Sequence, residues 1–286
     1  MRRQVVPGSI KNIDAARGVI LKLCFFALIA LTSFATAETP TRSAVPELPP
    51  QSKPIDDVLV PVPREVFESL DKFTNSNWGS VQRRGLARWK PHGDPPQAAL
   101  LLGALIAEGF IAVEAKDADQ VKKLGSAVLK VAAAVGVEKS VLRRSRAIIE
   151  DAERSDWEAV RKEWDGVFAD VEAAMAKLHS GQLSQLVSVG GWLRGTEALT
   201  VLLLQNYSAD RAELLRQPAS LDYFEQRMAG MNGELRSKTL VAKMQQGIRR
   251  IRPLVRSDGR ALSEKTVKEI GAIAKELVDE IDVRKR

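Results

Sequence analysis

The chain has 286 residues, of which 45% are hydrophobic, 5% aromatic and 28% charged, and it contains one cysteine. This composition supplies enough apolar side chains for a sizeable core, and it excludes a disordered tail, a collagen-like chain and a small disulfide scaffold. The formal net charge is +7. Charged residues are spread along most of the sequence, which argues against a protein with several membrane spans.

The first 37 residues have the three parts of a secretory signal peptide. A basic stretch is followed by an uncharged apolar run over 23–34 and then by Ala35-Thr36-Ala37, a small-x-small cleavage pattern. The apolar run is shorter than the about twenty residues of a spanning helix. We therefore expect cleavage after Ala37 and export to the periplasm or the exterior, with an uncleaved N-terminal membrane anchor as the alternative. Cleavage would remove Cys24 and lower the net charge to +3, because 1–37 holds five basic residues and one acidic residue.

Proline content and helix signals divide the rest of the chain. Seven prolines between 40 and 63 indicate an extended linker over 38–63, followed by a single helical domain over 64–286. Beyond Pro63 hairpin signals are almost absent, whereas capping patterns and helical periodicity are frequent. The predicted fold is all-α, an antiparallel helical bundle or array of about eight to ten helices. Helix starts are expected at Asp94, Asp117, Ser155 and Asp210, and helix ends at Gly136, Gly181 and Gly259.

Two segments lack the polar face that a surface helix needs. Residues 98–113 contain a single charge, Glu108, and residues 186–204 contain only Arg194 and Glu197. A helix that is apolar on all sides lies either in the centre of a bundle or in a membrane. Inserting one mid-helix Arg into a membrane costs about 2.5–3.5 kcal/mol, so we expect two central helices of a folded body.

Charges inside central helices must be paired, because an isolated buried charge is costly. We expect the two helices to pack together and to bring Glu108 close to Arg194, with Glu197 on the same face as Arg194. Two interpretations remain open: an ion network that fixes helix register, or a ligand pocket in which Arg194 holds an anionic group and Trp192 forms an aromatic wall. The close approach is expected to use Gly103, Gly109, Gly190, Gly191 and Gly195.

Motifs that would assign chemistry are missing. The two histidines, His92 and His179, fall in expected turns or helix ends and have no metal-ligand spacing. Phosphate-binding loops, dinucleotide fingerprints and nucleophile elbows are also missing from the sequence. We therefore expect no metal, no cofactor and no catalytic residue that the sequence can name.

A basic stretch over 234–260 carries eight bases and two acids. Its arginines would form one ridge only if the helix continued past Pro253, where a kink or an end is expected. A solvated helix face is one explanation, and a docking surface for anionic lipid headgroups is the other. Nucleic acid is not expected as a partner, because no aromatic residues are interleaved for base stacking. The ridge residues are Arg249, Arg252, Arg256 and Arg260.

The sequence therefore predicts an exported helical protein of the cell envelope that binds or scaffolds a small molecule or a protein partner. One alternative is an enzyme that uses a carboxylate in the Glu108, Arg194 and Glu197 cluster as general acid or base. The other alternative is peripheral association with a membrane surface through the arginine ridge.

Overall fold

The computed structural model describes residues 53–55, 58–60, 76–88, 94–256 and 260–282. The predicted signal peptide, most of the predicted linker, His92 and Gly259 lie outside these residues. The described part of the linker forms two short antiparallel strands, β1 (Lys53–Ile55) and β2 (Val58–Val60), with Ile55 opposite Val58.

The rest of the described chain is helical, which confirms the predicted all-α array. Three 3₁₀ turns, η1 (Trp78–Val81), η2 (Leu86–Arg88) and η3 (Glu213–Leu215), and two short helices, α7 (Ala209–Ala212) and α9 (Gly233–Ser237), join the longer elements. The long helices are α2 (Pro95–Glu114), α3 (Ala118–Ala134), α4 (Glu138–Glu153), α5 (Trp157–Lys177), α6 (Gly181–Gln205), α8 (Pro218–Ala229), α10 (Thr239–Val255) and α11 (Glu264–Ile281).

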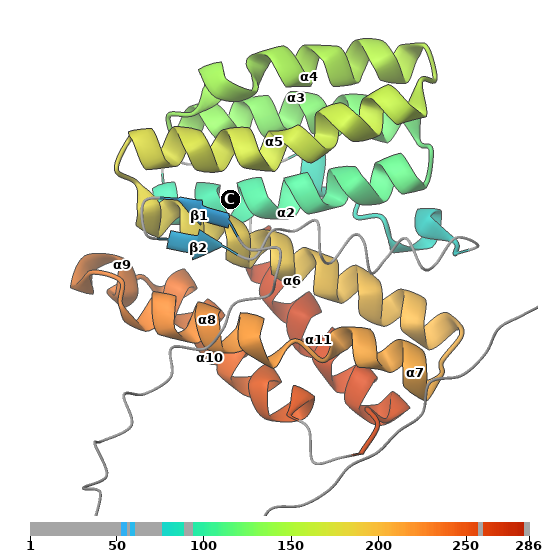
Figure 1. Ribbon diagram of the computed structural model, residues 1–286, viewed down its shortest axis with the longest axis vertical. Coiled ribbons are helices and arrows are strands. Elements are labelled where there is room, and N and C mark those ends of the chain that lie inside the picture. The colour runs from blue at the N-terminus through green and yellow to red at the C-terminus, as the bar shows by residue number, and fades with distance from the viewer. Residues whose placement is uncertain (1–52, 56–57, 61–75, 89–93, 257–259, 283–286) are drawn as a thin grey trace, which may run out of the picture. The chain divides into compact units, whose positions relative to one another are not determined.

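The long helices form two groups of four (Figure 1). In the first group, α2, α3, α4 and α5 pack in sequence order, and α5 closes the ring by contacting α2. In the second group, α6 contacts α8 and α11, and α10 lies between α8 and α11. The groups share a long interface between α2 and α6. These two helices therefore lie in the middle of the described fold, as predicted for the two apolar segments.

Four successive three-residue turns explain why α2 to α6 alternate in direction. In each turn the middle residue adopts the left-handed conformation: Lys116, Gly136, Ser155 and His179, with φ between 51° and 81°. The next residue's N–H then bonds to the carbonyl five residues earlier, at 2.9–3.0 Å. This bond satisfies a carbonyl at the helix end and turns the chain back on itself.

The predicted helix boundaries were right in some places and wrong in others. Asp117 caps α3, as predicted, by accepting from the Gln120 N–H at 3.1 Å. Ser155 was wrong as a helix start, because it takes the left-handed turn conformation and Asp156 caps α5 instead. The predicted start at Asp210 was also wrong, since the hydroxyl of Ser208 caps α7. Gly181 begins α6 rather than ending a helix.

Burial confirms the central position of the two apolar helices. Every residue of α2 from Pro96 to Val113 is buried, and so is nearly all of α6 from Ser184 to Leu203. Among the described residues, α2 alone is long and apolar enough to cross a membrane, and its most apolar stretch is entirely buried inside the protein. Among the other long helices, the amphipathic α3 and α11 pack directly on this pair, whereas α4 packs on α3 and α5.

Candidate functional site

Two glycines allow α2 and α6 to pack backbone against backbone. A Cβ added at Gly103 would lie 1.8 Å from the carbonyl oxygen of Val187, and one added at Gly190 would lie 1.9 Å from that of Leu100. No side chain fits at either position, so the two helices approach as closely as their backbones permit. Gly109 has a different role from the one predicted, because it faces the indole ring of Trp164 on α5 rather than α6.

The predicted contact between Glu108 and Arg194 is present at the centre of this interface. Arg194 binds Oε2 of Glu108 through Nε at 2.8 Å and through Nη2 at 2.7 Å. Glu108 is 0% exposed and Arg194 is 1% exposed. Arg194 Nη2 also donates to the carbonyl oxygen of Val81, and Nη1 lies 3.4 Å from Oε2 of Glu197. Glu197 therefore joins the cluster, as its i, i+3 spacing from Arg194 predicted.

A second arginine, Arg83, extends the cluster from the core to the surface. Its backbone N–H donates to Oε1 of Glu108 at 2.5 Å, and its guanidinium binds both oxygens of Glu197. The same guanidinium reaches Asp279 on α11 at 2.7 Å, and Asp279 in turn pairs with Lys275 at 2.7 Å. We call these six side chains the ion network: Arg83, Glu108, Arg194, Glu197, Lys275 and Asp279.

Burial and pairing act against each other on the pKa values of the network. Burial raises the pKa of Glu108, and the neighbouring charge of Arg194 only partly offsets it. Burial alone would lower the pKa of Arg83, but hydrogen bonds and attraction from Glu197 and Asp279 leave it raised. Burial likewise opposes ionisation of Asp279, yet Lys275 and Arg83 hold its pKa below the usual value. Burial therefore disfavours the charged form of Glu108, which lies deepest in the fold.

Trp192 does not join the network, so the predicted aromatic wall was wrong. Residues two apart on a helix point to nearly opposite sides, and Trp192 accordingly faces α8 while Arg194 faces α2. The indole Nε1 donates to Gln217 at 3.1 Å, and the ring packs against Phe224 with centroids 5.7 Å apart. Its contacts are those of a core residue in the second helix group.

The predicted arginine ridge is not a single basic surface. The helix α10 does run through Pro253, but it ends at Val255, so Arg256 and Arg260 lie beyond it. On the helix, Arg249 pairs with Glu225 at 3.1 Å and Arg252 pairs with the same carboxylate at 2.9 Å. Arg252 also pairs with Asp222 at 2.5 Å, so two carboxylates of α8 neutralise these two arginines and bind α10 to α8. This favours the interpretation as a solvated, ion-paired helix face.

Sequence reasoning missed Arg83, Lys275 and Asp279, and of these Arg83 connects the others to the buried centre of the network. It lies in a polar segment before α2 that has no helical period, and its contact with Glu197 spans 114 positions. The segment from Trp78 to Leu86 is anchored to the core by three buried apolar side chains, Trp78, Val81 and Leu86. The three apolar residues that flank the arginine were the only available signal in this segment.

Neither ligand clusters nor known relatives add to this picture. Within the described residues, no three His, Cys, Asp or Glu side chains gather closely enough to hold a metal ion. Comparison of the chain with family models, with curated proteins and with solved structures gives no match.

Proposed function

We propose that the protein is an exported binding or scaffold module of the cell envelope, and that the ion network serves its fold. The observation that carries this proposal is that each charge of the network contacts an opposite charge within it. Three cations face three anions, from Glu108 and Arg194 at the centre to Asp279 and Lys275 at the surface. A general acid or base must reach a bound substrate. Glu108 is fully buried and both of its oxygens are already bonded.

The ion network supports the proposal of a binding or scaffold module because it holds the segment 76–88 against α2 and α6. The carbonyl of Val81 and the backbone and side chain of Arg83 all bind charges carried by α2 and α6. The segment 76–88 follows the predicted linker in sequence. The network would therefore fix the point at which the chain that follows the predicted linker enters the helical body.

Carboxyl footprinting of the folded protein separates a module from an enzyme with its site in the network. A water-soluble carbodiimide and an amine nucleophile label carboxylates that solvent can reach, and peptide mass spectrometry measures each rate. Asp279 is the internal control, because it belongs to the same network with 48% of its side chain exposed. We expect Asp279 to be labelled readily and Glu108 only after unfolding. Labelling of Glu108 as fast as Asp279 would restore the enzyme interpretation.

Export has its own test. Intact-mass analysis of the chain recovered from a fractionated bacterial cell should find it in the envelope fraction, starting at Glu38 because the cleavage pattern ends at Ala37. Recovery from the cytoplasm with residues 1–37 still attached would contradict this part of the proposal.

A further inference from the structure

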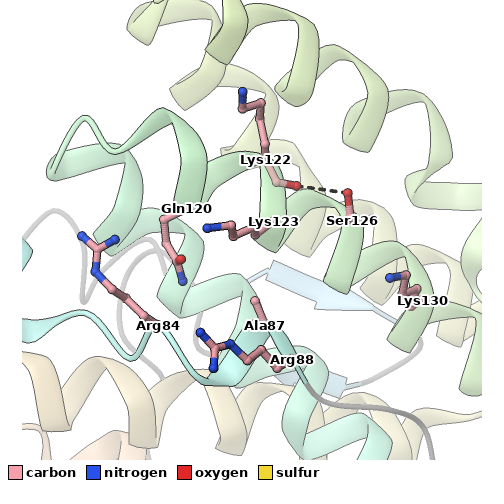
Figure 2. Close-up of a pocket in the computed structure, with 8 residues that line it drawn as sticks. All are labelled: Arg84, Ala87, Arg88, Gln120, Lys122, Lys123, Ser126 and Lys130. Carbon is pink, nitrogen blue, oxygen red and sulfur yellow. Dashed lines mark hydrogen bonds between the residues drawn. The ribbon is translucent and has the colours of Figure 1, made fainter.

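We propose that a basic pocket between η2 and α3 binds a ligand that carries a phosphate group. This pocket, here called the α3 pocket, has a volume of about 640 Å³ and lies outside the ion network (Figure 2). The inference rests on the proposed function as a binding module, to which it adds a ligand class. Five cations line the pocket and no acidic residue does: Arg84, Arg88, Lys122, Lys123 and Lys130.

The two walls of the pocket come from one face of α3 and from the turn that contains η2. Along α3, Gln120, Lys123 and Lys130 are three and seven positions apart, a spacing that places them on one side of a helix. On the opposite wall, Leu86 is buried in the core and holds η2 against α3. The neighbours of Leu86, Arg84 and Arg88, are thereby directed into the pocket (Figure 2).

The positive charge of the pocket is only partly neutralised. Asp117 pairs with Arg84 at 2.7 Å, and Asp119 lies 3.5 Å from Lys122, whose amino group points away from the other cations in Figure 2. The remaining three cations, Arg88, Lys123 and Lys130, have no ion-pair partner among the residues that the structure describes. Gathering like charges around a concave surface is unfavourable unless an anion neutralises them, so the pocket attracts anionic ligands.

Gln120 supplies a second, independent indication of a ligand. Its side chain extends from α3 toward η2 (Figure 2), and the residue is 1% exposed. Its amide Nε2 is buried and has no hydrogen-bond partner. Buried donors without an acceptor are rare in folded proteins and call for an explanation. A turn of this amide toward the α3 pocket would bring Nε2 to an acceptor oxygen of a ligand, which would provide the missing partner.

Phosphate fits these groups better than a single carboxylate does. A phosphate offers several strong acceptor oxygens and up to two negative charges, which suits an arginine fork, lysine point charges and an amide donor together. The volume falls in the range of small-molecule sites and exceeds that of inorganic phosphate. The ligand therefore carries a body beyond its phosphate, as a phosphorylated small molecule or a phospholipid headgroup does.

The ion network holds one wall of this pocket. Arg83 is fixed by Glu108 and Glu197, and the next residue, Arg84, faces the pocket. A wall that is already ordered loses little conformational freedom when a ligand binds. The buried charges thus contribute to binding by positioning η2, without touching the ligand.

Calorimetric titration of the purified full chain with inorganic pyrophosphate tests the proposal. We expect one saturable site whose affinity falls with ionic strength and falls by about tenfold or more in K123E and in K130E. The matched control is K139E on α4, which makes the same charge change at an exposed position outside the pocket. Q120L should weaken pyrophosphate binding while its melting temperature stays equal or rises, because it removes an unpaired buried donor.

Three results would overturn the proposal: no saturable binding, an equal loss in K139E, or citrate binding as tightly as pyrophosphate. Vesicles distinguish the sources of the phosphate. Binding to phosphatidylglycerol vesicles that pyrophosphate displaces and K123E weakens supports a headgroup, whereas pyrophosphate binding without vesicle binding supports a soluble phosphorylated ligand. A failed titration leaves the carboxyl footprint of Glu108 unaffected, so this proposal and the proposed function fail separately.

Discussion

Removing Arg194 is the sharpest way to perturb the ion network. In R194M a side chain of similar length remains, but Glu108 loses the only cationic side chain that pairs with it among the described residues, and the Val81 carbonyl loses a donor. Both are buried, so water cannot replace the missing bonds. Breaking a buried pair by removing one partner costs about 3–5 kcal/mol. That is a large part of the about 5–15 kcal/mol by which a typical domain is stable.

The pH dependence of this loss follows from the raised pKa of Glu108. A carboxyl whose pKa is higher in the folded state contributes stability below its unfolded value, 4.5, and loses it as the pH rises through the folded pKa. Without Arg194 the pKa of Glu108 rises further, because burial then acts unopposed. The penalty of R194M should therefore be smaller at about pH 5 than at about pH 8.

Urea unfolding followed by circular dichroism measures these effects. The control is R250M, which removes a surface ion pair between Arg250 and Glu276, whose side chains are 45% and 56% exposed. This substitution should cost less than about 1 kcal/mol. Adding E108Q to R194M should restore at least about 1 kcal/mol, because Gln carries no charge and still accepts from the Arg83 N–H. The reasoning is refuted if R194M costs no more than R250M, or if E108Q restores nothing.

Three further predictions concern packing, turns and acid stability. G103A and G190A should each lower the free energy of unfolding by about 1–3 kcal/mol or more, because the new methyl group would overlap backbone atoms. G233A should not, because the space around Gly233 is open. The midpoints of urea unfolding of the three variants test this difference. H179G should raise stability by about 1 kcal/mol in the same assay, since an exposed non-glycine residue there holds a φ of 51°; a loss would contradict the turn geometry. D279N should be less stable than wild type at neutral pH and equal to it in strong acid. The lowered pKa of Asp279 contributes stability above pH 3.8, its ordinary value, and this stability is lost as the pH falls. A stability difference that persists in acid would refute this prediction.

The central part of the fold could be predicted because its signals are local and strong. Glu108, the one charge in the apolar segment 98–113, needs a partner of opposite charge when it is buried, and the segment 186–204 contains Arg194. The last helix has an equally clear helical period of apolar residues, and three of them, Val267, Ile270 and Leu277, are buried in α11. In both cases the preference of individual side chains, for an opposite charge or for burial away from water, decides how the helices pack.

The remaining parts depend on contacts that no short stretch of sequence encodes. Ser155 and His179 occupy left-handed turn positions that glycine usually fills, so these two turns, unlike the one at Gly136, carried no recognisable signal. The α3 pocket requires Arg88 and Lys123 to meet across two elements, although each looks like an ordinary surface charge. Trp192 is different, because helical geometry alone already placed it opposite Arg194.

Hydrogen exchange of the wild-type protein tests the central claim, that α2 and α6 form the buried core pair, most directly. Backbone amides over 100–111 and 192–203 should exchange only when the whole helical body unfolds, and so more slowly than those of any other described helix. The short helix α9, none of whose residues is buried, should exchange fast and serves as the internal reference. Exchange in α2 or α6 as fast as in α9 would contradict the account.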